Sequence, residues 1–228
     1  MSSPPAARGH GRRWPIGPRP TALLIAICVG VGITGGLALR SPGNARPHGP
    51  QLVSAPTRAL EADAVWRPGQ RAAPPFALRD QANRLVSLSA QRGRAVLLAF
   101  MDSHCKLICS LEGPMLHSVL RRVGATEPVT LLVVSVNPWE DTAASTRAAV
   151  AHWRIAGDWH WLRGSTARLR PVWRSYGIAV VRTPSDVNHS TAIYLVDGRG
   201  YERAGFNWPF TAGPVVHNLR ALFPSPGS

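Results

Sequence analysis

Residues 97–109 read LLAFMDSHCKLIC, and this stretch changes character halfway along. Residues 95–100 form an uninterrupted apolar run, which predicts a buried β-strand. The segment 107–123 carries apolar side chains at helical spacing, so it predicts an α-helix. Cys105 and Cys109, with three residues between them, fall where the strand gives way to the helix.

This junction gives the two cysteines a chemical role. Residues four apart on a helix share one face, so both sulfurs lie on one side if Cys109 is already helical. Backbone N–H groups at a helix N-terminus favour negative charge, and we therefore expect a lowered pKa for Cys105. Two thiolates on one face can form a disulfide or hold a soft metal such as Cu(I). The alternative is a pair of buried, inert cysteines, but packing alone does not explain their place at such a junction.

Composition limits the classes of protein that fit. The chain has 228 residues and a net charge of +14, which suits one domain with appendages. A basic chain can bind nucleic acid or an anionic membrane surface. Lys106 is the only lysine, however, the arginines are scattered, and no nucleic-acid motif accompanies them, so no nucleic-acid partner is expected. Three cysteines exclude a disulfide framework, and the third, Cys28, lies within an apolar run.

The N-terminal part predicts a membrane anchor. Residues 1–20 are rich in Pro, Gly and Arg and predict a disordered cytoplasmic tail. Residues 21–39 carry no charge and are long enough to cross a bilayer once, and the positive charge before them places the C-terminal domain outside the cytoplasm, at the cell membrane. A cleaved signal peptide is the alternative, but the run is long and lacks a small-x-small site. Residues 40–71 predict a flexible linker, and residues 72–228 the folded domain.

The domain alternates strand and helix patterns. Apolar runs and alternation predict strands at 76–80, 85–88, 95–100, 129–136, 159–162, 191–196 and 201–206, and residues 178–181 form a further short apolar run. Helical spacing predicts helices at 107–123, 143–153, 167–176 and 213–222. Asp141 or Thr142 is expected to cap the second helix. This order predicts an α/β, thioredoxin-like fold with a central mixed sheet flanked by helices and preceded by one transmembrane helix.

Several segments of the domain together resemble the SCO/SenC family. They are PFALRD (75–80), VSL (86–88), GRAVLLAF (93–100), the Cys-x3-Cys pair, VSVNPWEDT (134–142) and VNHSTAIYLVDGRG (187–200). The resemblance implies a membrane-anchored, thioredoxin-fold copper chaperone that helps to assemble the copper site of cytochrome c oxidase. It also implies that Cys105, Cys109 and His189 bind copper.

The residue types agree with that implication. Two thiolates and one imidazole suit Cu(I) and can also accept Cu(II), whereas Zn²⁺ would favour a fourth ligand. The resemblance implies that the segment before strand 191–196 lies against the cysteine motif. Thioredoxins resemble one another in placing a cis-proline there, whereas this chain has Asn188-His189-Ser190, which favours a metal site over simple thiol exchange.

The chain departs from the family pattern at three positions. Lys106 and Ser110 follow the two cysteines where the family usually has proline, and Asn137-Pro138 stands where Asp-Pro is familiar. The charge of Lys106 lowers the pKa of nearby thiols but opposes the binding of a cation. His104, beside Cys105, is a weaker ligand candidate.

Two functions from different classes fit these features. The first is a metallochaperone that delivers copper to, or prepares the copper site of, a respiratory oxidase, with an oxidase subunit as its partner. The second is a thiol–disulfide oxidoreductase in which Cys105 attacks and Cys109 resolves the mixed disulfide. A thiol–disulfide reductase would be a further partner. The tryptophans of the domain are interpreted as packing residues, or as part of a surface on which a partner docks.

Overall fold

The computed structural model describes residues 60–223 of the chain. These residues belong to one compact unit, 53–228. The expected tail, membrane helix and most of the linker, residues 1–59, lie outside the described part. Within residues 60–223, no helix is both long and apolar enough to cross a membrane.

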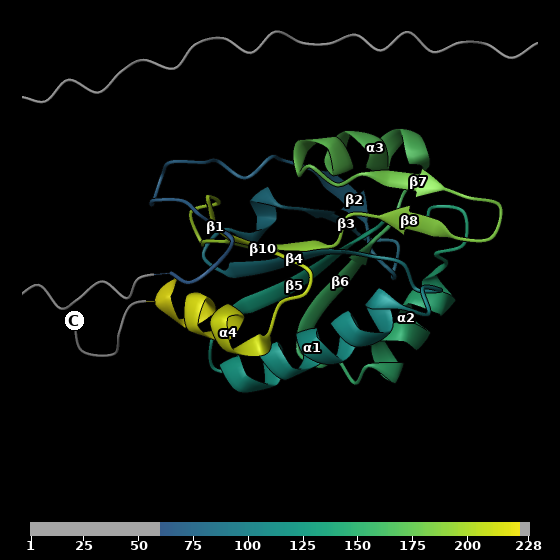
Figure 1. Cartoon of the computed structure of the whole chain (residues 1–228). Helices are drawn as coiled ribbons and strands as arrows, with labels where there is room; N and C mark the ends of the chain where they lie inside the picture. Colours follow the sequence, from purple (N-terminus) through teal and green to yellow (C-terminus); the bar gives the residue numbers. More distant parts are fainter. Residues whose placement is uncertain (1–59, 224–228) are drawn as a thin grey trace, which may run out of the picture. The chain divides into compact units, whose positions relative to one another are not determined.

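A six-stranded sheet in the order β1-β10-β9-β4-β5-β6 forms the centre of the domain (Figure 1). Its strands are β1 (Ala64–Val65), β4 (Ala95–Met101), β5 (Val129–Ser135), β6 (Asp158–Leu162), β9 (Ala192–Val196) and β10 (Glu202–Asn207). Strands β4, β5 and β6 run parallel, whereas β9 is antiparallel to β4, β10 to β9, and β1 to β10. The sheet is therefore mixed, and the α/β, thioredoxin-like prediction is confirmed.

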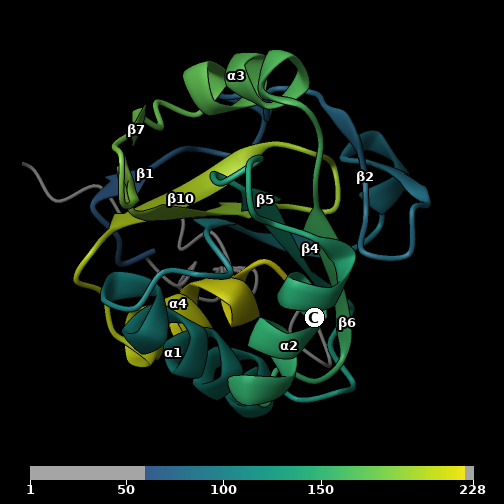
Figure 2. The ribbon, with the colours of Figure 1, turned by 90° about the vertical axis from the view of Figure 1, so that its right-hand side faces the viewer.

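Helices cover both faces of this sheet (Figures 1 and 2). One face packs against α1 (Ile108–Val123), α2 (Ala143–His152) and α4 (Ala212–Ala221). The other face packs against α3 (Thr166–Ser175) and the hairpin of β2 (Ala77–Arg79) and β3 (Leu85–Ser87), which the 3-10 turn Ser89–Gln91 follows. A second hairpin, β7 (Val180–Arg182) and β8 (Val187–His189), lies on the right-hand side of Figure 1.

Strand β4 is apolar throughout and β5 is mostly apolar, because both faces of these strands are covered. All seven residues of β4 and all seven of β5 are buried. Leu97 and Ala99 face the core with α1, whereas Leu98 and Phe100 face the core with α3. Burying one such leucine contributes about 1.5–3 kcal/mol, so this pair of strands anchors the fold.

A glycine permits the close packing of α1. The ring of Trp153 lies so near Gly113 that a Cβ on this glycine would be 2.1 Å from Trp153 Cδ2. Trp153 also stacks on Trp161, with ring centroids 6.0 Å apart. Trp161 and Trp173 are buried, as their interpretation as packing residues requires, whereas Trp139 is 39% exposed.

The folded domain begins earlier than residue 72. Ala64 pairs with Gly205 and Val65 pairs with Ala204 of β10, so the end of the expected linker belongs to the sheet. A strand of two residues is too short to show alternation against a background rich in Pro, Gly and Arg. The boundary placed at 72 was therefore too late.

The outer edge of β6 is covered by the β2–β3 hairpin. Gln81, in the hairpin turn, accepts a hydrogen bond from Trp161 N–H at 2.9 Å and donates one to Trp159 O at 3.5 Å. Arg163 N–H donates to Arg79 O at 2.7 Å. These bonds satisfy backbone groups that an edge strand otherwise presents to solvent.

Candidate metal and thiol centre

The predicted site residues lie where β4 leads into α1 and where β8 ends. The loop from β4 to α1 carries Cys105, and the first turn of α1 carries Cys109. His189 ends β8, in the hairpin beside them. Strand β4 ends here, and its antiparallel neighbour β9, which follows β8, begins here, so residues distant in the sequence come together.

Cys105 is held at the N-terminus of α1, as expected from the sequence. The backbone N–H of Cys109 donates to Cys105 Sγ at 3.3 Å, so this sulfur satisfies one of the free N–H groups of the first turn. The Cys109 thiol, together with the backbone N–H groups of Cys109 and Leu107, lowers the pKa of Cys105 to about 6. The pKa of Cys109 is raised by its bond to Cys105 and by burial. Both cysteines are free thiols.

His189 presents one ring nitrogen to this pair. Its Nε2 lies 3.9 Å from Cys109 Sγ, while its Nδ1 lies 3.0 Å from the carbonyl oxygen of Ser190. The carbonyl can only accept, so we assign the proton to Nδ1, which leaves the lone pair of Nε2 directed towards the thiol. Burial lowers the pKa of His189, and a neutral imidazole is the form that binds metals.

The three predicted residues form close pairs rather than a closed triad. Metal ligands in proteins are commonly His, Cys, Asp or Glu side chains. Within residues 60–223, one group of three such side chains has all its ligand atoms within 4.8 Å of one another, and it consists of Asp102, His104 and Asp141. Cys109 is near both Cys105 and His189, but the two sulfurs and the imidazole nitrogen are not all within 4.8 Å of one another.

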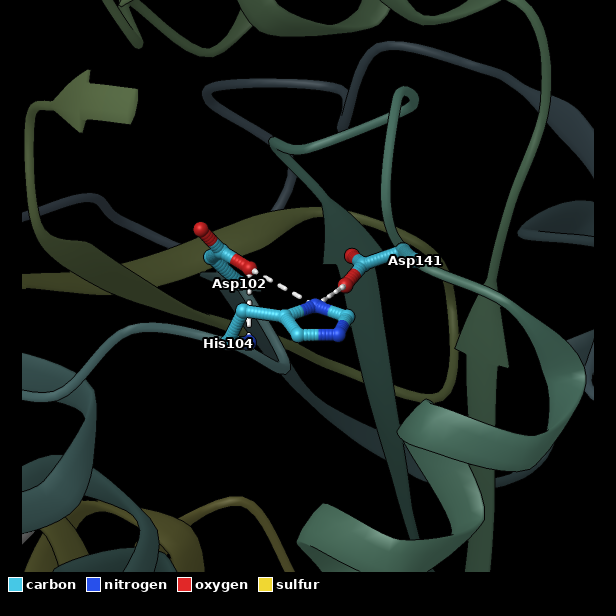
Figure 3. A group of neighbouring side chains, drawn as sticks. All are labelled: Asp102, His104 and Asp141. Atoms are coloured by element: carbon cyan, nitrogen blue, oxygen red, sulfur yellow. Dashed lines mark hydrogen bonds and ion pairs between the residues drawn. The ribbon is translucent and has the colours of Figure 1, made fainter. Parts of the chain in front are cut away.

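Asp102, His104 and Asp141 lie close together where the chain leaves β4 (Figure 3). His104 Nδ1 lies 3.8 Å from Asp102 Oδ1 and 3.9 Å from Asp141 Oδ1. Both oxygens already accept hydrogen bonds from the loop, at 2.8 Å from His104 N–H and 2.9 Å from Ser103 N–H. The carboxylates therefore fix the backbone that leads to Cys105.

Asn137 has a physical reason to stand where aspartate is familiar. Its amide Nδ2 donates to Asp102 Oδ2 and to Glu140 Oε2, at 3.0 Å in each case. An aspartate here would bring a third negative group between two carboxylates, so the amide joins side chains that would otherwise repel each other.

Glu112 was missed in the sequence, although it lies on the buried face of α1. It is fully buried, and neither carboxyl oxygen has a hydrogen-bond partner within residues 60–223. Burial, with a smaller contribution from the charge of Cys105, raises the pKa of Glu112 to about 8. Its position three residues after Cys109, on the face that also carries Leu116, was the signal available in the sequence.

These features define a thioredoxin-like domain with a free thiol pair and a neutral imidazole at one end of its sheet. The family model described as SCO1/SenC matches residues 66–223. The chain is 35% identical over 234 residues to the mitochondrial protein SCO2 homolog of Bos taurus, covering 96% of this chain and 82% of that protein. The chain therefore belongs to the SCO1/SenC family.

Solved structures agree with this membership. Bradyrhizobium japonicum ScoI with copper bound has a TM-score of 0.58 and 26% identity, covering 67% of this chain and 99% of that one. BsSco, described as a member of the Sco family of cytochrome c oxidase assembly proteins, has a TM-score of 0.58 and 21% identity, covering 72% and 96%. At this identity the second likeness shows the fold alone.

Proposed function

We propose that this protein is a membrane-tethered, extracytoplasmic copper-binding factor that delivers copper to, or prepares the copper site of, a respiratory oxidase. Copper is then its cargo, held by Cys105, Cys109 and His189. The observation that carries the proposal is the 3.9 Å approach of His189 Nε2 to Cys109 Sγ, with Nδ1 bonded elsewhere. Membership of the SCO1/SenC family and a relative solved with copper bound support it.

The chemistry of the ligands suits copper. Thiolates bind Cu(I) well, and the imidazole also accepts Cu(II). Cys105 has a pKa of about 6, so it offers a thiolate at neutral pH. Cys109, whose pKa is raised, loses its proton as the metal binds, and loading therefore releases protons. Because the ligands are not a closed set, the β8 hairpin and the cysteine loop must approach each other on binding.

The tether and the partners complete this proposal. Residues 21–39 supply a single membrane span, residues 1–20 remain in the cytoplasm, and the linker gives the folded domain reach above the membrane. A copper-accepting oxidase subunit receives the metal, and a thiol–disulfide reductase keeps the cysteine pair reduced.

A second candidate function is reduction of a disulfide on a partner, favoured by the thiolate character of Cys105. The Cys105 thiolate attacks the partner's disulfide and releases one partner thiolate. Cys109 then loses its proton and attacks the Cys105 sulfur, which releases the second partner thiolate. The partner gains two thiols, and this chain holds a Cys105–Cys109 disulfide that the reductase restores.

Replacing His189 separates the two functions. We expect the reduced unit 53–228 to bind Cu(I) one to one in anaerobic competition with a Cu(I) chelator. His189→Ala should weaken that binding by at least about 100-fold, since loss of even an outer partner of a metal ligand costs 10–100-fold. The Cys105–Cys109 disulfide should still form in this variant.

His152→Ala is the matched control, because His152 is exposed at the end of α2. It should bind Cu(I) like the wild type. Unchanged affinity in His189→Ala would remove His189 from the ligand set. Wild-type binding no tighter than that of unstructured thiols would leave the oxidoreductase as the better function.

A further inference from the structure

A hollow of about 460 Å³ lies beside the candidate site, between α3 and the β7–β8 hairpin. The two elements are neighbours in both views (Figures 1 and 2). Trp139, Arg170, Arg174, Val181 and Arg182 are among the residues that line it. We call this hollow the arginine groove.

We propose that the arginine groove binds an acidic segment of the protein that receives copper from the site. This inference rests on the proposed function, since it names the surface through which the same acceptor docks.

The groove is continuous with the site along the chain and through the sheet. Val180 and Val181 line it, and they pair with His189 and Asn188 of β8. Trp139, which also lines it, comes two residues after Asn137, whose amide contacts Asp102 in the loop before the cysteines. A segment seated here therefore touches both elements that border the copper ligands.

Its positive charge is not neutralised by the residues that the structure describes. Arg170, Arg174 and Arg182 are exposed, and no Asp or Glu of residues 60–223 lines the groove. None of the three takes part in the ion pairs found within residues 60–223, in which other arginines contact Asp or Glu. Guanidinium groups bind carboxylates in pairs of hydrogen bonds, so the groove complements an acidic ligand.

The charges converge from two elements rather than following from an arginine-rich composition alone. Arg170 and Arg174 come from α3, one turn apart, and Arg182 comes from β7. The guanidinium of Arg182 lies 4.7 Å from the ring centroid of Trp139, and this contact orients it.

The form of the surface favours a polypeptide over a membrane. Trp139 is 39% exposed and Val181 is 59% exposed, so the groove joins apolar contact area to its charges. Aromatic residues and arginine are enriched where proteins dock on one another. A hollow accepts an extended chain, whereas a bilayer surface needs a flat or protruding basic face.

The test is a charge reversal with a matched control. The groove variant is Arg170→Glu with Arg174→Glu and Arg182→Glu in unit 53–228, which contains both hydrophobic cores described above. The control carries Arg67→Glu, Arg121→Glu and Arg154→Glu, which are exposed arginines outside the groove. The probe is the purified copper-accepting soluble domain of the respiratory oxidase of the same organism.

We expect the groove variant to bind this domain at least about tenfold more weakly than the wild type, and the control less than about threefold. Cu(I) affinity measured with the chelator should stay the same in both variants. The dependence of binding on salt should also decrease in the groove variant, because fewer charge contacts remain. A triple Arg→Gln variant, which removes the charges without reversing them, serves if the Glu variant does not fold.

The outcomes distinguish the two proposals. A wild-type domain that binds no Cu(I) contradicts the proposed function. Normal Cu(I) binding with unchanged docking of the groove variant overturns the arginine groove alone, as does equal weakening by the control or failure of the wild type to bind the acceptor. Loss of binding to vesicles containing phosphatidylserine, with docking to the acceptor intact, would assign the groove to a membrane surface instead.

Discussion

The two sides of the cysteine pair place buried carboxyl groups in opposite environments. On the loop side, Asp141 accepts hydrogen bonds from Ser103, Ser135 and Trp161. On the helix side, Glu112 is equally buried but has no hydrogen-bond partner within residues 60–223. The first carboxyl group holds the loop in shape, whereas the second is kept in its neutral form next to the thiols. One side therefore sets the geometry of the site, and the other sets its charge.

Removing the loop-side carboxyl should have the largest effect on stability. Asp141→Ala leaves the N–H of Ser103, the hydroxyl of Ser135 and the indole N–H of Trp161 without their acceptor. Each unsatisfied buried donor costs about 1–3 kcal/mol, so we expect the free energy of unfolding to fall by about 3–5 kcal/mol. Urea unfolding at pH 7 measures this, with Glu127→Ala at the other end of the domain as the control. A loss below about 1 kcal/mol would show that the loop does not depend on Asp141.

The helix-side carboxyl should make stability depend on pH. Folding raises the pKa of Glu112 from 4.5 to about 8, so the folded state binds more protons than the unfolded state between these values. The contribution of Glu112 is thus present below pH 4.5 and is lost as pH rises towards 8. A shift of this size corresponds to at most about 5 kcal/mol.

Glu112→Gln should remove this slope, and urea unfolding between pH 5 and pH 8 measures it. The lowered pKa of Cys105 contributes an opposite slope above about pH 6, but the wild type and the variant share it. The difference between the two proteins therefore isolates Glu112. Parallel pH profiles would mean that the carboxyl finds a partner or water in solution.

The smallest effect should come from the packing of α1 against the ring of Trp153. Gly113→Ala places a Cβ 2.1 Å from the Trp153 ring, so we expect a loss of about 1–3 kcal/mol from overpacking. Gly213→Ala in α4 is the matched control, because no atom lies within 4 Å of the new Cβ. Alanine is the better helix former, and the control should gain about 0.5–1 kcal/mol. Equal stabilisation by both changes would show that Trp153 moves aside without cost.

Burial on two faces made the centre of the fold predictable. Residues 95–100 are an unbroken apolar run, and residues 129–136 are a nearly continuous one interrupted by Thr130 and Ser135, because helices cover both sides of β4 and β5. The short strands gave no such signal. Strand β1 has two residues, and in β8 a buried valine is followed by the polar residues Asn188 and His189. Pairing with a neighbouring strand stabilises such short strands, so the local sequence pattern does not predict them.

The site was predictable only where the chemistry is local. Cys105 and Cys109 stand out by their spacing at the start of a helix, and His189 came from the family resemblance. Asp141 was expected as a possible helix cap, but Thr142 caps α2 and accepts from Ser145 N–H. Asp141 instead accepts a hydrogen bond from the backbone N–H of Ser103, 38 residues earlier in the chain. No local sequence pattern indicates such a contact.

The covered edge of β6 has a consequence for behaviour at high concentration. An uncovered edge strand can recruit the same strand of a second molecule and start aggregation. Because the side chain of Gln81 occupies the N–H of Trp161 and the carbonyl of Trp159, an incoming strand must first displace it. The membrane tether proposed above would bring copies of this protein close together. Gln81, at the tip of the β2–β3 hairpin, thus hinders pairing of β6 with the same strand of another copy.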